Sequence, residues 1–541
     1  NNTFELRGEY LLVNTTASCI DSLLVHRPFY ESCHFPEQQA LTSIFQDDYS
    51  RYNLFILSAA LQPGDSLYLR FEVQSPPPSI LERQPKVKAN GTFLRTNIFP
   101  RIGYRQTEIT DPKLRRRYGL GSLDSLAAAR QHRGRGHYQA PDSDWIEWEA
   151  TLSTVGNQTA LAPGELIRQW QNGKRRYFQY RSAAPIKFSI GLFSARYAVV
   201  IDTAGAIPVR LFYQQGHEYN LERLRAGVRQ ALEHNSTQFS PFSQHSLNLV
   251  EFPVTEGSFA TLYGNLIPFS ELYFLANVRP HSNDLDLPFY VAAHEMSHHW
   301  WGHQLLSAYG PGALMLTESL AEYAALEILD QAYGTEARRQ FLEWDHRQYF
   351  QTRKSASDPE LPLIQAKSGQ EYVNYQKGAL VMQALAARIG RPTFHALLAD
   401  FLAQYRSSGA GYPTATAFLQ FLKTCLPEVL HGYLDEQFQQ IVTYTLRLDR
   451  VSCKPALPDQ FLVAIAGQAQ KELQGEASPL EHPFEVCIYG EDEKLLLKDT
   501  LQSSSIGWSQ RYELGQRAVR IVLDPDCHFL DPNRSDNTAR F

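Results

Sequence analysis

Residues 292–304 read AAHEMSHHWWGHQ, which gathers histidine, glutamate and tryptophan in one short stretch. His294 and His298 lie four residues apart, and Glu295 follows the first of them, which is the HExxH spacing. In a helix, residues four apart share a face, so two imidazoles can bind one metal ion while the glutamate faces a water molecule. The flanking residues are mostly apolar. The stretch therefore predicts a metal centre with a catalytic base on a buried helix.

A second stretch, LTESLAEYAALEIL (316–329), supplies the expected third ligand. A catalytic zinc ion usually takes three protein ligands and keeps one position for water. Nineteen residues that include the turn sequence YGPG separate His298 from Glu318, so two helices can fold back on each other. A solvated helix face is the alternative, but Glu318 stands between two leucines. We therefore predict one Zn²⁺ per chain, held by His294, His298 and Glu318. We also predict that Glu322, one turn further on, supports a ligand imidazole by a hydrogen bond.

The two other histidines of the first stretch are not expected to bind the ion. His299 points about 100 degrees away from His298 around the helix. His303 lies about two and a half turns beyond His294, close to the opposite side of the helix. We expect both side chains to pack against neighbouring residues.

The composition narrows the class of protein. The chain has 541 residues, of which 43% are hydrophobic and 20% are charged, as in ordinary globular proteins. At about 150 residues per domain, three or four domains are expected. The net charge of -6, from 51 basic and 57 acidic residues, gives no reason to expect nucleic acid as a partner. The sequence has no run of 18 apolar residues, so we expect no membrane-spanning helix in it.

The periodicity of the apolar residues predicts a multidomain α+β protein. Alternation with a period of two, as in DSLYLRFEV and WIEWEATL, predicts an antiparallel, β-rich domain over residues 1–200. The spacing then becomes helical, as in NLERLRAGVRQALEHN, and we expect a mainly helical domain over 201–450, with helices to about Tyr444. Short alternating runs return after it and predict a small C-terminal β-sandwich over 451–541.

Two features allow more than one interpretation. The segment 113–137 is rich in arginine and glycine and fits either a basic binding loop or, more commonly, a solvated insertion between strands. The cysteines fall into two groups, which fits either local disulfides in an oxidising compartment or buried free thiols. The two groups are Cys19 and Cys33 near the start, and Cys425, Cys453, Cys487 and Cys527 near the end.

The motifs resemble those of the aminopeptidase N-like zinc metallopeptidases, which are gluzincins. HEMSHHWWG followed by LTESLAEY is similar to the family's HExxH(Q)WxG…LNEG(F)AxY, with one residue more than usual between the second histidine and the third ligand. We expect the connecting loop to absorb that residue. NYQKGALVMQAL (374–385) resembles the family's Y-x-K-G-(A/S) segment. The resemblance implies a thermolysin-like catalytic domain behind a saddle-like N-terminal domain. It also implies that Tyr375 stabilises the tetrahedral intermediate.

The chain departs from this family where a substrate's free α-ammonium group would bind. Family members carry a G-x-M-E-N strand whose glutamate pairs with the ammonium. The corresponding stretch here, EGSFATLYGNLIPFSE, places Phe259, Ala260 and Thr261 at the Met-Glu-Asn positions. Glu256 or Glu271 is an alternative acid. The departure predicts weak or absent recognition of a free amino terminus.

Three segments narrow the resemblance to a bacterial subgroup: FPRIGYRQTEITDPKLRRRYGL, HHWWGHQ and ESLAEYAAL. In that subgroup the peptidase-like domain is fused to, or encoded with, an ABC-transporter permease and faces away from the cytoplasm. We therefore expect an extracytoplasmic location, periplasmic or at the cell surface, and membrane permease segments of a parent protein as partners. The chain begins at Asn1 without a methionine, which we interpret as the start of a processed or excised piece.

The sequence thus predicts a zinc-dependent metallopeptidase that hydrolyses peptide bonds through a zinc-bound water. Glu295 would act as the general base and pass the proton to the leaving amine, and Tyr375 would donate a hydrogen bond to the oxyanion. The alternative is a non-catalytic peptide-binding or sensor domain associated with an ABC transporter, which the missing ammonium anchor favours. A structural metal site is a third interpretation, but structural zinc prefers four protein ligands.

Overall fold

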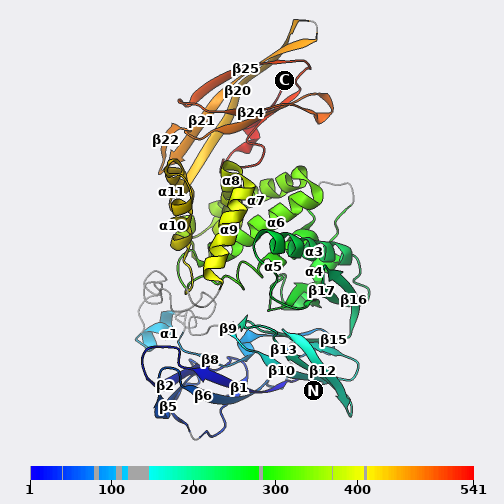
Figure 1. Cartoon of the computed structure of the whole chain (residues 1–541), viewed down its shortest axis with the longest axis vertical. Helices are drawn as coiled ribbons and strands as arrows, with labels where there is room; N and C mark the ends of the chain where they lie inside the picture. Colours follow the sequence, from blue (N-terminus) through cyan, green and yellow to red (C-terminus); the bar gives the residue numbers. More distant parts are fainter. Residues whose placement is uncertain are drawn as a thin grey trace.

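The computed structural model describes residues 2–38, 40–77, 85–104, 112–119, 145–279, 284–367, 369–406, 411–457 and 459–541. Three regions follow one another along the long axis of the molecule: β-rich, then mainly helical, then β-rich again (Figure 1). This order confirms the multidomain α+β fold. Within the described ranges, no helix has both the length and the apolar character needed to span a bilayer. Most of the arginine-rich segment 113–137 lies outside the described residues.

The N-terminal region consists of small antiparallel sheets. Their strand orders are β1-β6-β3, β4-β5-β2-β8, β10-β13-β12, β11-β15-β7 and β14-β9. In β6 the residues Leu69, Phe71 and Val73 are buried and alternate with more exposed ones, as the period of two predicts. The strands are β1 (Glu5–Val13), β2 (Ile20–His26), β3 (Ser32–His34), β4 (Leu41–Gln46), β5 (Tyr52–Leu61), β6 (Ser66–Gln74), β7 (Thr92–Arg95), β8 (Arg101–Ile102), β9 (Trp145–Ile146), β10 (Glu149–Val155), β11 (Thr159–Leu161), β12 (Glu165–Asn172), β13 (Arg175–Arg181), β14 (Ile186–Lys187) and β15 (Gly191–Ala195).

The central region begins with a mixed sheet of β16 (Tyr197–Ala204), β17 (Ile207–Gln214), β18 (Leu247–Phe252) and β19 (Leu266–Ser270). β16 and β17 are antiparallel, whereas β17, β18 and β19 run parallel. The periodicity of the apolar residues does not distinguish this sheet from the helices around it. The domain boundary predicted after residue 200 falls inside β16.

Helices cover the sheet and build most of the central core. The helix predicted from NLERLRAGVRQALEHN is confirmed as α3 (Leu221–Gln238). It lies close against α5 because Gly227 has no side chain: a Cβ there would come within 2.9 Å of the Ala292 Cβ. The other helices and helical turns are α1 (Pro112–Arg117), α4 (Glu271–Leu275), α5 (Leu287–Ser297), α6 (Leu320–Tyr333), α7 (Thr335–Ser355), α8 (Gly378–Ile389), α9 (Arg391–Tyr405), α10 (Ala415–Cys425), α11 (His431–Gln439), η1 (Thr96–Ile98), η3 (Val254–Glu256), η4 (Met315–Ser319), η5 (Leu363–Gln365), η6 (Val373–Lys377), η8 (Glu428–Leu430), η9 (Glu491–Glu493) and η10 (Arg534–Asp536).

The prediction of helix up to Tyr444 is wrong at its end. α11 stops at Gln439, and the first C-terminal strand, β20, begins at Val442. The run Ile441, Val442 and Thr443 is β-branched, which favours a strand. Val442 pairs with Leu473 of β21 across the sheet. The boundary predicted after residue 450 also falls inside β20.

The C-terminal region consists of two antiparallel sheets, as predicted. One contains β20, β21, β22 and β25, and the other has the order β24-β23-β26-β27. The rings of Phe484 and Trp508, one from each sheet, lie 5.5 Å apart. All six cysteines lie in described residues and are unpaired, so local disulfides are not formed. The strands are β20 (Val442–Leu457), β21 (Gln460–Leu473), β22 (Glu476–Pro479), β23 (Phe484–Tyr489), β24 (Leu495–Leu501), β25 (Gly507–Leu514), β26 (Arg520–Leu523) and β27 (Thr538–Arg540).

Candidate metal centre

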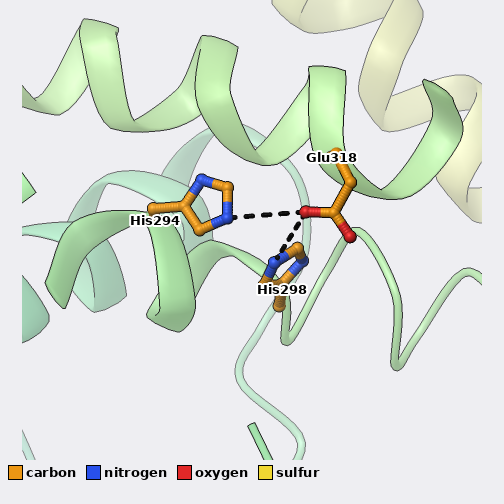
Figure 2. Close-up of side chains that lie close together, drawn as sticks. All are labelled: His294, His298 and Glu318. Atoms are coloured by element: carbon orange, nitrogen blue, oxygen red, sulfur yellow. Dashed lines mark ion pairs between the residues drawn. The ribbon is translucent and has the colours of Figure 1, made fainter. Parts of the chain in front are cut away.

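Two elements bring the predicted metal ligands together: the end of α5 and the π turn η4, which leads directly into α6. His294 lies in the last turn of α5, His298 caps its C-terminus, and Glu318 lies in η4. Nε2 of His294 is 3.6 Å, and Nε2 of His298 is 3.3 Å, from Oε2 of Glu318 (Figure 2). The three side chains that the sequence nominates as ligands therefore converge on one point.

The second nitrogen of each imidazole faces an acceptor. Nδ1 of His298 lies 3.0 Å from the backbone oxygen of Trp301. Nδ1 of His294 lies 3.2 Å from Oε1 of Glu322, near enough for an ion pair but not aligned for a hydrogen bond. The hydroxyl of Tyr290 donates to Oε2 of Glu322 and holds that carboxylate behind His294. Both histidines can therefore keep a proton on Nδ1 and present a bare Nε2 to a metal ion.

Burial and charge give the two central carboxylates opposite protonation behaviour. Burial raises the pKa of Glu295 above its usual value, and the nearby histidines offset this only in part. Burial also acts to raise the pKa of Glu318, but the facing His298 and His294 outweigh it and hold the pKa well below its usual range. Glu318 therefore stays anionic, as a ligand must, while Glu295 is suited to accepting and releasing a proton.

The donor set fits zinc. Imidazole nitrogen and carboxylate oxygen are both zinc ligands, and the three donor atoms lie within 4.8 Å of one another. Oε2 of Glu318 and Oε2 of Glu295 are buried, and neither has a hydrogen-bond partner among the described residues. Leaving such oxygens unsatisfied is costly, and a cation with its water would satisfy both. Three protein ligands also leave one position open, which is the pattern of a catalytic site.

Tyr375 enters the site from a different part of the chain. It lies in the π turn η6, and its ring is stacked 6.0 Å from the ring of His294, centroid to centroid. Burial raises the pKa of Tyr375 far above its usual value, and the Glu318 and Glu295 carboxylates raise it further. The hydroxyl therefore stays protonated and can act as a hydrogen-bond donor.

His299 and His303 point away from the metal ligands. Nε2 of His299 lies 3.1 Å from the Ser243 hydroxyl, and Nε2 of His303 lies 3.1 Å from the Leu262 backbone oxygen. Burial lowers the pKa of His299 to about 3, so this ring is neutral.

Two contacts from the N-terminal region were not predicted. Nζ of Lys187 donates to the Gly302 oxygen at 3.3 Å, and Nε1 of Trp145 donates to the His303 oxygen at 3.1 Å. Gly302 has a φ of 132°, which favours glycine, and a Cβ there would lie 2.9 Å from Thr317. Both contacts therefore brace the turn that follows His298. Paired strands β9 and β14 provide them, and no sequence motif marks these residues.

The positions expected to anchor an α-ammonium group carry no acid. Phe259, Ala260 and Thr261 run antiparallel to β19, with Ser270 N donating to Phe259 O at 3.0 Å. The Arg95 guanidinium lies over the Phe259 ring, 4.6 Å from its centroid. These positions therefore hold no carboxylate, and the Phe259 ring is covered by a cation from β7.

The two acids considered as substitutes are engaged elsewhere. Glu256 forms an ion pair with Lys88 at 2.5 Å, and Glu271 accepts a hydrogen bond from the Val254 amide at 2.8 Å. Glu271 also belongs to a second His/Glu cluster with His217 and Glu251.

That second cluster is held by hydrogen bonds. Nδ1 of His217 lies 2.5 Å from Oε1 of Glu251. Oε2 of Glu251 accepts from the Gln214 amide at 2.7 Å. A metal ion would have to displace these bonds, so we do not interpret the cluster as a metal site.

The site has two imidazoles and a carboxylate that face one point, beside a buried glutamate. This arrangement is typical of zinc hydrolases. Residues 264–436, which contain all of these side chains, match the family model described as the Peptidase family M1 domain. No curated protein sequence matches the chain.

Solved structures share the fold. An M1 zinc metallopeptidase from Deinococcus radiodurans is 16% identical, with a TM-score of 0.54, over 80% of this chain and 89% of that one. A mutant of a Deinococcus radiodurans M1 zinc metallopeptidase bound to a Tyr-Ser-Ala substrate is 16% identical, with a TM-score of 0.53, over 80% and 90%. Legionella pneumophila aminopeptidase A, in complex with aspartic acid, is 12% identical, with a TM-score of 0.57, over 97% of this chain and 57% of that one. These likenesses establish a common architecture.

Proposed function

We propose that this protein is a zinc-dependent metallopeptidase. The observation that carries the proposal is the convergence of His294, His298 and Glu318 at one point beside the buried Glu295. The match of residues 264–436 to the M1 peptidase domain supports it. A zinc ion held by the three ligands would supply a Lewis acid that acidifies water toward a pKa of ~7 and polarises a peptide carbonyl.

Three side chains around the ligands have separate roles in proton transfer, oxyanion stabilisation and orientation of a ligand. Glu295 takes a proton from the attacking water and passes it to the leaving amine, which its raised pKa permits. Tyr375 stays protonated and donates a hydrogen bond to the oxyanion as it develops. Glu322 holds His294 in the orientation that exposes its Nε2.

We further propose that substrates need no free amino terminus. An α-ammonium group that lost its water would need a carboxylate partner. Arg95 over Phe259 puts a positive charge where that partner is absent, and Glu256 is already paired with Lys88. Both features support a cleft that accepts N-blocked or internal peptide bonds.

The deciding experiment compares matched free and N-acetylated peptides, with and without a chelator. We expect zinc-dependent cleavage, with no large preference for the free amine. A preference of about 100-fold for the free amine in kcat/KM, equivalent to about 2.7 kcal/mol, would mean that another acid fills the anchor. Zinc-dependent binding without any cleavage would support the alternative, a peptide-binding or sensor domain.

The cellular setting is also a proposal. The subgroup resemblance supports an extracytoplasmic domain that works beside an ABC-transporter permease. Crosslinking of the full-length protein in intact cells, with a membrane-impermeant reagent, tests both the location and the partner. Labelling only after cell lysis would contradict the location.

A further inference from the structure

The catalytic tyrosine and the third metal ligand lie on two π turns that touch each other. Glu318 is in η4 and Tyr375 is in η6. A π turn holds one residue more than an α turn, is uncommon, and is often found at functional sites. The residues that join the two turns are the immediate neighbours of the functional ones.

One hydrogen bond links the turns. The Ser319 hydroxyl donates to the Asn374 backbone oxygen at 2.6 Å. Both residues are fully buried, so water does not compete for the bond. Ser319 follows Glu318, and Asn374 precedes Tyr375. The bond therefore joins the residue after the predicted ligand to the residue before the tyrosine.

The two turns can approach this closely because residue 378 is a glycine. A Cβ on Gly378 would overlap the Ser319 hydroxyl and would lie 2.6 Å from the Ser319 Cβ. It would remain 3.4 Å from the Ser319 Cα, which is an ordinary contact. The serine side chain thus fills the whole space that the glycine leaves.

We propose that Ser319 is a positioning residue that sets the place of the Tyr375 hydroxyl relative to the Glu318 carboxylate. The inference rests on the proposed function, because Tyr375 must act on the reacting carbonyl for its placement to matter. A shift of about 1 Å in a positioned group can cost up to a hundredfold in rate. Ser319 is not one of the predicted metal ligands, and its hydroxyl bonds to the Asn374 backbone oxygen.

The first test is Ser319→Ala, which removes the hydroxyl and keeps the Cβ. We expect zinc content and KM to stay within about twofold of the parent and kcat to fall about tenfold. In a Tyr375→Phe background the same substitution should change kcat by less than about twofold, because the group being positioned is gone. Equal effects in both backgrounds would overturn the proposal.

The second test separates packing from the hydrogen bond. Gly378→Ala alone should lower the melting temperature, because its methyl group meets Ser319. Adding Ser319→Gly should restore the melting temperature, since only the Cα then faces the methyl group. The double variant, Gly378→Ala with Ser319→Gly, should still have a lower kcat than the parent protein. Recovery of kcat together with the melting temperature would assign Ser319 to packing alone.

Ser307→Ala is the matched control. Its hydroxyl is also fully buried and donates to a backbone oxygen, that of Ala313, at 2.8 Å. We expect it to lower stability while leaving kcat unchanged. A kcat loss as large as that of Ser319→Ala would contradict a specific role.

A crystal structure of Ser319→Ala gives a readout that needs no turnover. We expect Tyr375 to be displaced while His294, His298 and Glu318 keep their places. An unmoved Tyr375 would overturn the proposal whether or not the protein is a peptidase. An inactive parent protein with a displaced Tyr375 in the variant would instead contradict the proposed function and leave the positioning role supported.

Discussion

Glu295 and Glu318 are neighbouring carboxylates with different surroundings. Glu318 faces two imidazole nitrogens within 3.6 Å, whereas no histidine among the described residues forms an ion pair with Glu295. We therefore expect His294→Ala and Glu318→Ala to lose most of the zinc, while Glu295→Gln keeps about one ion per chain and loses hydrolysis. Elemental analysis of the purified variants checks this. Loss of zinc from Glu295→Gln as complete as from His294→Ala would contradict the division of roles.

Substitution of Glu322 should reduce zinc affinity less than substitution of a ligand. It supports His294 but lies outside the ligand set. Glu322→Gln should weaken zinc affinity by about 10–100-fold without abolishing binding. Competition with a chromogenic chelator measures the affinity, and an unchanged value would remove Glu322 from the site.

Tyr375 has a well-matched control three residues away. Tyr375→Phe should lower kcat about a hundredfold with KM nearly unchanged, because one oxyanion donor is lost. Tyr372 is buried, and its hydroxyl has no hydrogen-bond partner among the described residues. Tyr372→Phe should therefore leave kcat unchanged. Steady-state kinetics on one N-acetylated peptide checks both, and equal kcat for Tyr375→Phe and the parent would make Tyr375 a packing residue.

Sequence spacing predicts which residues lie close together where the spacing itself determines geometry. His294 and His298 follow from the helical repeat, and Glu318 from the apolar run around it. Lys187 and Trp145 could not be found in this way. They reach the site through strand pairing in another region, and neither has a spacing relation to the ligands.

At the scale of elements, the junction of α11 and β20 shows where sequence periodicity fails. GYLDEQFQQIVTYTL keeps apolar residues at spacings that suit a helix, yet its second half pairs with β21. Pairing with β21, a strand further along the chain, makes this segment a strand. A local sequence pattern does not contain that information. Sequence periodicity does not predict the two π turns either, because their sequences resemble those of ordinary α-helices.

The same junction contains a carboxylate that ties α11 to the C-terminal sheets. Glu436 bonds to Lys471 at 2.9 Å, to His482 at 3.2 Å and to the Tyr444 hydroxyl. Burial acts to raise the pKa of Glu436, but these hydrogen bonds outweigh it and lower the pKa to about 2. Because the folded pKa lies below the unfolded one, the stabilisation is complete above about pH 4.5 and is lost as the pH falls toward 2.

We therefore expect Glu436→Gln to lower the free energy of unfolding by up to about 3 kcal/mol at pH 7. The difference from the parent should shrink below about pH 4.5 and vanish near pH 2. Urea denaturation at several pH values measures it. Glu476→Gln, at an exposed site on β22, should have little effect throughout. A pH-independent difference for Glu436→Gln would point to lost packing instead of lost charge.

At the scale of the whole molecule, the N-terminal region contributes several contacts to the central helical region. Lys187 and Trp145 donate hydrogen bonds to the turn after His298, and Arg95 lies over the ring of Phe259. Lys187 is buried, which lowers its pKa to about 8, although the Glu318 and Glu295 carboxylates act to raise it. The charges beside the turn after His298 and beside Phe259 therefore depend in part on contacts between the first two regions.

Arg95→Glu tests that dependence. A carboxylate in place of the guanidinium should attract an α-ammonium group and raise kcat/KM for free-amine peptides relative to N-acetylated ones by about tenfold, or about 1.4 kcal/mol. Lys174→Glu makes the same change in net charge at an exposed turn and should leave the ratio unchanged. The ratio is measured with matched peptide pairs at constant ionic strength. No change with Arg95→Glu would show that this side chain does not face the substrate.

The two π turns also make the site sensitive to chain length. Removing any one residue from Met315–Ser319 or Val373–Lys377 would leave an ordinary α turn and rotate the chain on one side of it by about 100 degrees. Such a deletion could spare every functional side chain and still point Glu318 or Tyr375 away from the others. Homologues that differ by single insertions or deletions should therefore place them in the loops and keep both turns at constant length.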